Sequence, residues 1–340
     1  MTNLEARPTE RVCEAGPTDP GPDGAPAPVE LIEPRDVPLG GPRAMTVRRT
    51  LPARRRSLIG PFCFVDHYGP DDISVTGGMD VAPHPHTGLQ TVTWLFTGRV
   101  LHRDALGSVQ SIAPGQLNLM TAGNGICHSE EGTLRRFPEQ GVLHGVQLWT
   151  ALPDDARHGP GDFEHVAQVP VADVDGATVR VFMGTLAGVT SPARGYSPLV
   201  AAQVDVPAGA RVRLGVDPGF EHGVLVDAGD LAVDGTDVPE AWLAYAAPGR
   251  EEIELVAGDR PVRAVLIGGE PFGEQILMWW NFVTRTHEET VEARRLWQAA
   301  IAGDPEGVAR FGEVTGYDGP PLPAPELPHV RLKPRVNPGG

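Results

Sequence analysis

The stretch from residue 89 to residue 120 decides the fold class, because it alternates short apolar runs with turn-forming residues. It reads LQTVTWLF (89–96), TG, RVLHRD (99–104), ALGS, VQSIAPG (109–115) and QLNLM (116–120). Short runs that are rich in β-branched and aromatic side chains, and that are bounded by glycine, proline or aspartate, are typical of strands. Strands at this close spacing predict an all-β sandwich or barrel.

The same pattern continues in the second half of the chain, in GVLVDAGDLAVDG (223–235), WLAYAAPG (242–249), EEIELVAG (251–258) and VRAVLIGG (262–269). The strand–Pro–Gly–strand unit IAPGQLNLM (112–120) also resembles YAAPGREEIEL (245–255), which indicates an internal repeat. We therefore expect two tandem β domains, the first over residues 29–165 and the second over 166–303. The boundary is expected near residues 160–170, where the charged, proline-containing segment LPDDARHGPGD (152–162) ends the first domain.

The composition narrows the function classes. The 340 residues include 42 glycines and 35 prolines, which leaves little room for long helices. The formal net charge of −16 disfavours direct binding to nucleic acid. Three scattered cysteines (Cys13, Cys63 and Cys127) make no disulfide framework, and no run approaches the ~18 apolar residues of a membrane span. A cytoplasmic protein is the expectation.

The two ends of the chain differ from its middle. Residues 1–28 are rich in proline, glycine and acidic side chains, so we expect a disordered tail. Thr286 and Glu289 predict a capping box that opens a short helix, which Gly303 ends. Residues 304–340 are again rich in proline and glycine, and we expect a tail that wraps the surface or is disordered.

Two histidine clusters carry the chemistry. His84-Pro85-His86 lies just before the run 89–96, and His128-Ser129-Glu130 follows the run 116–120. Because residues two apart in a strand share a face, His84 and His86 can point the same way, and so can His128 and Glu130. Three imidazoles and one carboxylate suit a divalent first-row metal and leave two positions of a six-coordinate ion open. The alternative is that these are ordinary polar or buried histidines.

Alternation along the strand places these side chains. If one extended segment runs from His84 to Phe96, the even positions form its more apolar face and are expected to look into the barrel. That face is made by His84, His86, Gln90, Val92, Trp94 and Phe96. Cys127 would point away from the ligands, and a hairpin turn at Thr97-Gly98 would put His102 on the outer face.

The other histidines and the clustered arginines have simpler expected roles. We expect surface or hydrogen-bonded roles for His67, His158, His165, His222 and His287. His102 and His144 lie in the half that carries the clusters, where either can support a metal ligand. The arginine cluster of residues 48, 49 and 54–56 is expected to be a solvated edge strand.

Five motifs together resemble the pirin family of the cupin superfamily. They are VRRTLPARRRSLIGPFCFVDHYGP (47–70), HPHTGLQTVTWLFTGRVLHRD (84–104), PGQLNLMTAGNGICHSE (114–130), HGVQLWTALP (144–153) and GGEPFGEQILMWWNFVTRTHEE (268–289). The resemblance implies a bicupin, that is, two tandem jelly-roll domains with a short C-terminal helix. It implies one metal in the first domain, held by His84, His86, His128 and Glu130. Iron(II) is the usual metal, and manganese, nickel, copper and zinc occur in related cupins.

The resemblance also sets two expectations for function. The first is a quercetin 2,3-dioxygenase that uses O₂ to open the central ring of a flavonol, with Glu130 accepting the hydroxyl proton while it remains a ligand. Gln90 can then hydrogen-bond a metal-bound water, and Val92, Trp94, Phe96 and Met120 line either a dry pocket or an ordinary core. The alternative is a non-enzymatic, metal-bound regulatory protein that binds transcription factors or metabolic enzymes. The second domain has no H-x-H motif and is expected to bind no metal.

Overall fold

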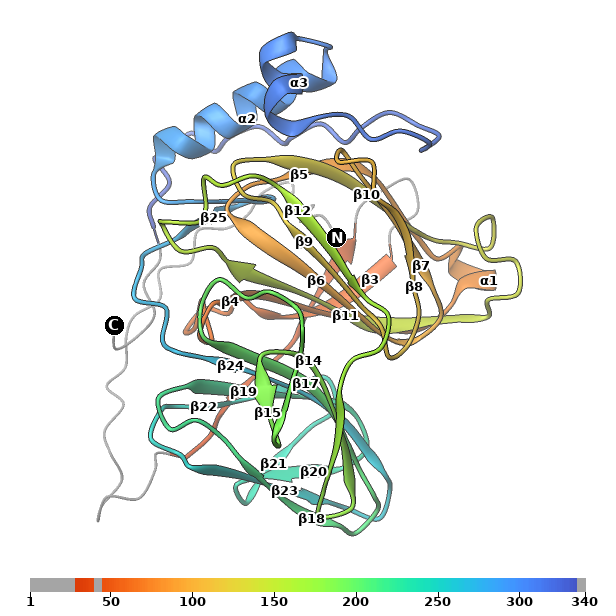
Figure 1. The fold of residues 1–340 in the computed structure, drawn as a ribbon, viewed down its shortest axis with the longest axis vertical. Coiled ribbons are helices and arrows are strands. Elements are labelled where there is room, and N and C mark those ends of the chain that lie inside the picture. The colour runs from red at the N-terminus through yellow and green to blue at the C-terminus, as the bar shows by residue number, and fades with distance from the viewer. Residues whose placement is uncertain (1–27, 40–44, 335–340) are drawn as a thin grey trace.

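The computed structural model describes residues 28–39 and 45–334, and it consists of two β-barrels stacked one on the other (Figure 1). Each barrel is built from one seven-stranded and one four-stranded antiparallel sheet, which confirms the predicted tandem jelly-roll architecture. The expected disordered tail at residues 1–28 lies outside the described residues except for Pro28. Among the helices that the structure describes, none is both long and apolar enough to cross a membrane.

The first barrel pairs its sheets in the orders β12-β9-β6-β11-β4-β3-β2 and β5-β10-β7-β8. Its strands are β2 (Arg35–Leu39), β3 (Met45–Leu51), β4 (Phe62–Asp72), β5 (Met79–His86), β6 (Leu89–Thr97), β7 (Val100–Asp104), β8 (Val109–Ile112), β9 (Leu117–Thr121), β10 (Ile126–Gly132), β11 (Val142–Ala151) and β12 (Asp162–Val166). A single helical turn, α1 (Ile73–Thr76), follows β4.

The second barrel has the sheet orders β1-β22-β19-β24-β17-β14-β13 and β18-β23-β20-β21. Its strands are β1 (Glu30–Ile32), β13 (Val171–Val174), β14 (Ala177–Met183), β17 (Leu199–Val206), β18 (Arg211–Gly215), β19 (Glu221–Ala228), β20 (Leu231–Val233), β21 (Thr236–Val238), β22 (Leu243–Ala246), β23 (Glu252–Ala257) and β24 (Val262–Gly269). Two small hairpins add β15 (Thr185–Leu186) to β16 (Val189–Thr190) and β25 (Leu277–Trp279) to β26 (Phe282–Thr284).

Near both ends of the chain, a segment that lies within one expected domain pairs with a strand or residue of the other barrel. Strand β1 is near the N-terminus, yet it pairs with β22 of the second barrel. After β24 the chain returns to the first barrel, where Phe282 of β26 bridges to Thr87. The two barrels are therefore linked by exchanged segments as well as by the direct connection between β12 and β13.

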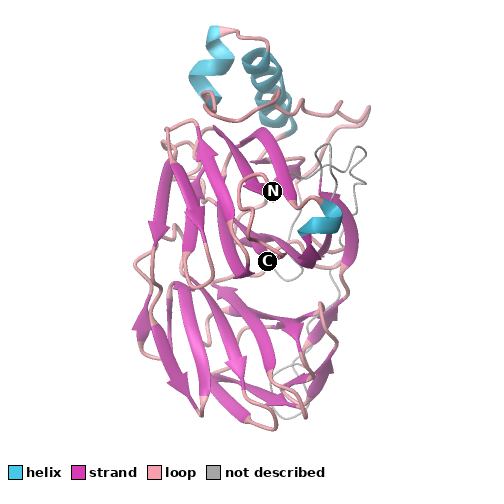
Figure 2. Ribbon diagram, turned by 90° about the vertical axis from the view of Figure 1, so that its right-hand side faces the viewer, coloured by secondary structure: helices cyan, strands magenta, loops and turns pink. Residues whose placement is uncertain are grey.

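The C-terminal helix forms as predicted. In α2 (His287–Ile301) the Thr286 side chain accepts a hydrogen bond from the backbone N–H of Glu289, and Ala293, Leu296 and Trp297 are buried. A second helix, α3 (Pro305–Phe311), follows within the segment that we expected to be a tail. The chain beyond it wraps the first barrel, because the N–H of Leu322 donates to the carbonyl of Pro83 in β5. Figure 2 shows both helices gathered at one end of the molecule.

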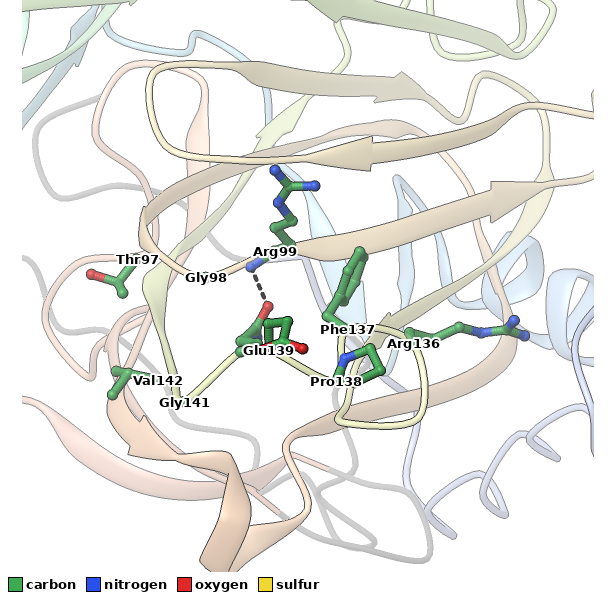
Figure 3. Close-up of a pocket in the computed structure, with 10 residues that line it drawn as sticks. Thr97, Gly98, Arg99, Arg136, Phe137, Pro138, Glu139, Gly141 and Val142 are labelled. Atoms are coloured by element: carbon green, nitrogen blue, oxygen red, sulfur yellow. Dashed lines mark hydrogen bonds between the residues drawn. The ribbon is translucent and has the colours of Figure 1, made fainter.

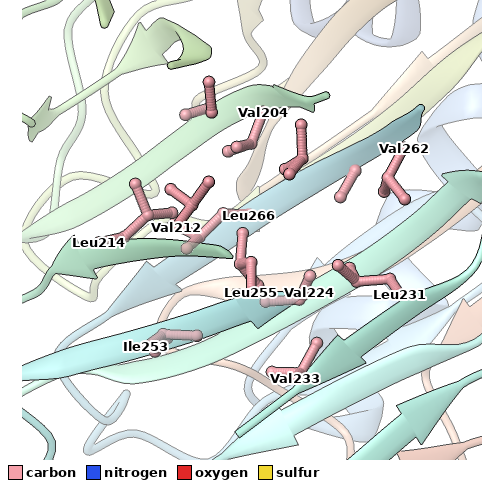
Figure 4. Packing of buried hydrophobic residues seen from close by; sticks show 14 of the residues in the cluster. Val204, Val212, Leu214, Val224, Leu231, Val233, Ile253, Leu255, Val262 and Leu266 are labelled. Atoms are coloured by element: carbon pink, nitrogen blue, oxygen red, sulfur yellow. The ribbon is translucent and has the colours of Figure 1, made fainter. Parts of the chain in front are cut away.

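The core of the second barrel is almost wholly aliphatic. Figure 4 shows side chains from both of its sheets, among them Val204, Leu214, Val224 and Leu266, packed into one cluster. Burying such side chains stabilises the fold by roughly 25 cal/mol per Å² of apolar surface. Within the part of the chain that the structure describes, no group of metal-ligating side chains lies inside this aliphatic core, and the expectation that the second barrel binds no metal stays a prediction.

One histidine interrupts this core and leads to a prediction about acid stability. His222 lies on the β19 face that carries Val224, and neither ring nitrogen has a hydrogen-bond partner. Burial, assisted by Arg250, lowers the pKa of His222 to about 4. The unfolded chain takes up this proton near pH 6.5. The contribution of neutral His222 to the free energy of unfolding is therefore fully present above pH 6.5, and about 3 kcal/mol of it is lost as the pH drops to about 4.

Urea unfolding between pH 7 and pH 4 tests this assignment. The free energy of unfolding of a His222→Met variant should fall by about 3 kcal/mol less over this range than that of the natural chain. Parallel curves for the two proteins would contradict this assignment.

Candidate metal centre

Three histidines converge inside the first barrel. His84 and His86 lie on β5, and His128 lies opposite His84 on the neighbouring strand β10. Each offers one ring nitrogen, and these nitrogens all lie within 4.8 Å of one another. The ring centroids of His84 and His128 are 4.3 Å apart. Because alternate residues of a strand share a face, the H-x-H spacing places two of the three ligands by itself, and the strand pairing adds the third.

The three imidazoles are held neutral and without partners at the ligating atom. All three side chains are completely buried, and the Nε2 atom of each makes no hydrogen bond. Burial holds the pKa of His84, His86 and His128 well below the ordinary value. In His84 the Nδ1 lies 2.8 Å from the carbonyl of Ala82. Since a carbonyl only accepts, Nδ1 carries the proton and Nε2 presents its lone pair to the centre.

Glu130, the fourth predicted ligand, occupies the same strand but a different level of the barrel. It is buried and pairs with Val81 and His102, and the β10–β5 register shifts between His128 and Glu130. It does not belong to the group of ligand atoms that lie within 4.8 Å of one another. Burial raises the pKa of Tyr68 well above its ordinary value, and the charge of Glu130 adds to that rise.

His102 corrects one sequence expectation. It is buried on the inner face, because β7 pairs with β10 rather than with β6. Its Nε2 lies 3.0 Å from Oδ2 of Asp104, and its Nδ1 lies 3.4 Å from Nδ1 of His128. Burial alone would raise the pKa of Asp104, but the hydrogen bond from His102 keeps it lowered. With the proton of His102 on Nε2, its Nδ1 can accept from His128, which leaves Nε2 of His128 free to ligate.

The contacts of His102 with His128 and with Asp104 lead to a prediction. Replacing His102 by phenylalanine keeps a flat side chain but removes the acceptor that fixes the tautomer of His128. Outer hydrogen-bond partners of metal-bound histidines are typically worth 10–100-fold in affinity. We expect the tightest bound equivalent of Ni²⁺ to weaken by about that factor in competition with a chromophoric chelator. His158→Gln, at an exposed histidine, is the matched control. Equal affinity in the two variants would show that His102 does not support the site.

Aromatic and charged side chains line the barrel beside the histidines. Trp149 meets His86 edge-on at 5.0 Å, and Phe64 stacks on Trp149 at 3.9 Å. The Arg49 guanidinium lies 4.1 Å above the Phe64 ring and forms a two-pronged ion pair with Asp66, at 2.6 and 2.8 Å. Our expectation of a solvated arginine strand was therefore wrong for Arg49, which is buried in β3 between β2 and β4, and for Arg56, which is also buried.

Of the two alternatives for the apolar side chains of β6, the structure shows the ordinary core, but the expectation that this face of β6 looks into the first barrel was wrong. Met120 packs in a separate cluster with Phe64 and Trp149. Val92, Trp94 and Phe96 belong to the cluster that packs the first barrel against the second. Trp94 stacks on Phe182 of the second barrel. Gln90 does not reach the centre either, because its side-chain amide donates to Thr121 Oγ1 and to the carbonyl of Arg194. Gly88, at φ +68°, ends the extended segment before β6, so the alternation does not run through from His86.

The remaining histidines divide as the sequence indicated, with His222 as the exception. His158 is exposed, and hydrogen bonds involve His67, His165 and His287. Cys127 is buried on the face opposite His128, where its thiol donates to the carbonyl of Gly312 near the end of α3. It therefore packs against the C-terminal extension and is not part of the histidine group.

A hairpin closes the barrel end beside His86. The N–H of Val283 in β26 donates to the carbonyl of Thr87, and the Asn281 backbone lies next to the His86 ring. A Cβ atom on Gly88 would lie 2.1 Å from the carbonyl oxygen of Val283, so only glycine allows this close approach. The wide surface hollow of ≈ 640 Å³ is elsewhere. Figure 3 shows it between Arg99 and Pro138, and none of the three histidines lines it.

Comparison with known proteins agrees with this architecture. The family model described as Pirin matches residues 44–150, and the model described as Pirin C-terminal cupin domain matches residues 201–303. The chain belongs to the pirin family. The first match spans the barrel of this pirin that carries the three histidines, and the second spans most of the barrel with the aliphatic core.

Several relatives of this pirin carry names that include an activity. It is 41% identical to "Putative quercetin 2,3-dioxygenase PA1205" of Pseudomonas aeruginosa, over 94% of this chain and 97% of that protein. It is 37% identical to a pirin-like protein of Caulobacter vibrioides, over 74% of this chain and 88% of that one. Among solved structures, quercetin 2,3-dioxygenase from Acinetobacter baumannii matches with a TM-score of 0.82 and 38% identity, covering 90% of this chain and 98% of that one.

Proposed function

We propose that this pirin is a metal-dependent dioxygenase of the quercetin 2,3-dioxygenase type. The observation that carries the proposal is the convergence of three buried imidazoles whose Nε2 atoms have no hydrogen-bond partner. Buried polar atoms without partners cost free energy, so three of them at one point indicate a ligand that satisfies them together. The names of the relatives from Pseudomonas aeruginosa and Acinetobacter baumannii support the same activity.

The donor set fits a divalent first-row metal. His84, His86 and His128 would hold it through Nε2, and Glu130 would add a carboxylate from the next inward-facing position of β10. Iron(II) is our first choice, and manganese, nickel, copper and zinc share the ligand preference. When bound, a redox-active metal supplies Lewis acidity and a route for electrons between an organic substrate and O₂.

The side chains around the centre would accept a proton, contact the substrate and exclude water. Glu130 would accept the proton of the flavonol 3-hydroxyl, since it is the carboxylate nearest along β10 to the histidines. Trp149 would offer an aromatic side chain to a flat substrate beside His86, with Phe64 stacked against it. Burial keeps bulk water away from the reacting atoms. In the overall reaction both atoms of O₂ enter the ring-opened ester, and the carbon that carried the 3-hydroxyl leaves as carbon monoxide.

The test uses the full chain, stripped of metal and reloaded with Fe(II) under anaerobic conditions. After O₂ is admitted, quercetin absorbance should fall while O₂ is consumed and carbon monoxide is released in equal amounts. Glu130→Gln keeps the size of the side chain but removes the proton acceptor, so turnover should fall by about 100-fold or more, which is the range for a general base. Protein with confirmed metal that leaves quercetin absorbance unchanged would refute the proposal.

A further inference from the structure

A second cluster of ligating side chains lies between the two barrels. His67 of β4 and His144 of β11 come from the first barrel, and Asp227 of β19 comes from the second. Figure 1 shows β4 and β11 at the side of the first barrel that faces the second. All three residues are buried, and one ligand atom from each lies within 4.8 Å of the other two. These atoms are the two Nε2 nitrogens and Oδ1 of Asp227.

Hydrogen bonding accounts for only part of the crowding in this cluster. Oδ1 of Asp227 lies 2.6 Å from Nε2 of His67 and 2.6 Å from Nε2 of His144. The two Nε2 atoms are 3.3 Å apart, and a guanidinium nitrogen of Arg48 lies 3.3 Å from the first of them. A ring nitrogen makes one hydrogen bond, either as donor or as acceptor. Both Nε2 atoms can donate to Oδ1 of Asp227, so the contacts left without a hydrogen bond are those of His67 Nε2 with Nε2 of His144 and with Arg48.

We propose that these three side chains form a second site for a divalent metal ion of the zinc class. Two imidazoles and one carboxylate are a donor set that such ions accept. Metal bonds of about 2.0 Å in a tetrahedron place neighbouring ligands roughly 3.3 Å apart, which matches the separation of the two nitrogens. The carboxylate oxygen draws back slightly to complete the triangle, and the fourth position is open to water.

Two arginines, Arg263 and Arg48, lie beside the proposed site. The second oxygen of Asp227 accepts a hydrogen bond from Nε of Arg263 at 2.6 Å, which leaves Oδ1 for the ion. Ligating carboxylates are commonly hydrogen-bonded in this way. Arg263 is 29% exposed and can turn toward solvent, while Arg48 also interacts electrostatically with Asp36 and Glu240. The two guanidinium groups limit the affinity of the site without blocking it.

The proposed site is separate from the centre inside the first barrel. His67 and His144 project from the outer face of their sheet, beside Val65 and Val146 of the cluster between the barrels. The three histidines of the first centre project inward from the opposite sheet. An ion bound here would join the barrels directly, because His67 belongs to the first barrel and Asp227, 160 positions away in the chain, belongs to the second.

The test counts zinc ions on the full chain, after loading and dialysis, by elemental analysis. The natural chain should hold two ions, Asp227→Asn one, His128→Ala one, and the combined variant none. Asp230→Asn, at an exposed ion pair of the second barrel, is the matched control and should hold two. A zinc content in Asp227→Asn equal to that of the natural chain would overturn the proposal.

A second measurement needs no variant. Calorimetric titration of the metal-free natural chain with Zn²⁺ should show two equivalents of binding. A single equivalent would overturn the interbarrel site, even if Asp227→Asn failed to fold. Neither result depends on turnover of a flavonol, so the proposed activity and the second site can fail independently.

Discussion

Replacing His128 by alanine is expected to remove turnover almost completely. The change deletes one of three convergent nitrogens and also the partner of His102. Changing an outer partner of a metal ligand already reduces activity 10–100-fold, so loss of the ligand itself should lower flavonol turnover by more than about 100-fold. Turnover is measured as loss of quercetin absorbance, and bound metal by elemental analysis of the same sample.

The matched control for this variant is His158→Ala, which changes an exposed histidine of the same domain. It should retain both the metal and the activity. The His128→Ala chain should remain folded, because a buried imidazole without a protein partner at Nε2 contributes little to stability on its own. A His128→Ala protein that turns over quercetin at the natural rate would show that the chemistry lies elsewhere.

The second large effect concerns stability. Arg49 and Asp66 form an ion pair in which the two side chains are 1% and 0% exposed. Removing one member of a buried pair leaves an uncompensated charge, at a cost of about 3–5 kcal/mol. Arg49→Met should therefore lower the free energy of unfolding of the first barrel by that amount in urea. The combined variant Arg49→Met/Asp66→Leu should recover much of the loss, because neither charge remains buried.

Arg54→Met is the control for this pair, since Arg54 is exposed in the same arginine-rich segment. It should change the unfolding free energy by less than about 0.5 kcal/mol. If Arg49→Met and Arg54→Met were equally stable, the ion pair would contribute nothing. The contrast also tests whether the arginine segment is one solvated unit, as the sequence indicated, or is divided by burial, as the structure has it.

Much of the fold was readable from the sequence because its signals are local. Strand alternation, Pro-Gly turns and the capping box at Thr286 each act over a few residues, and the structure confirms the β architecture and α2. The convergence of His84, His86 and His128 was equally accessible. The H-x-H spacing fixes the shared face, and antiparallel pairing of β5 with β10 adds the third ring.

The sequence did not reveal which face of β6 points into the first barrel. Alternation correctly divided the strand into two faces, but the more apolar face with Trp94 packs against the second barrel, not into its own. The inward face carries Thr93, which donates to Gln147 of β11. In an isolated barrel the apolar face would be the interior. Here the apolar face of β6 packs into a cluster shared by the two barrels, and no local pattern reports that.

The cluster of His67, His144 and Asp227 was beyond the sequence for a related reason. Each residue comes from a different strand, and no short sequence motif joins the three. Hydrogen bonding was the natural expectation for His67. Only the packing of one barrel on the other brings its Nε2 within 2.6 Å of a carboxylate that lies in the second domain.

The most direct test of the account is an anomalous-scattering map from crystals of the iron-loaded chain, collected at the iron absorption edge. We predict a strong peak inside the first barrel, bounded by Nε2 of His84, His86 and His128, with a carboxylate oxygen of Glu130 completing the ligand set. If elemental analysis finds iron in these crystals and the map shows no peak between the three histidines, the proposed centre is wrong.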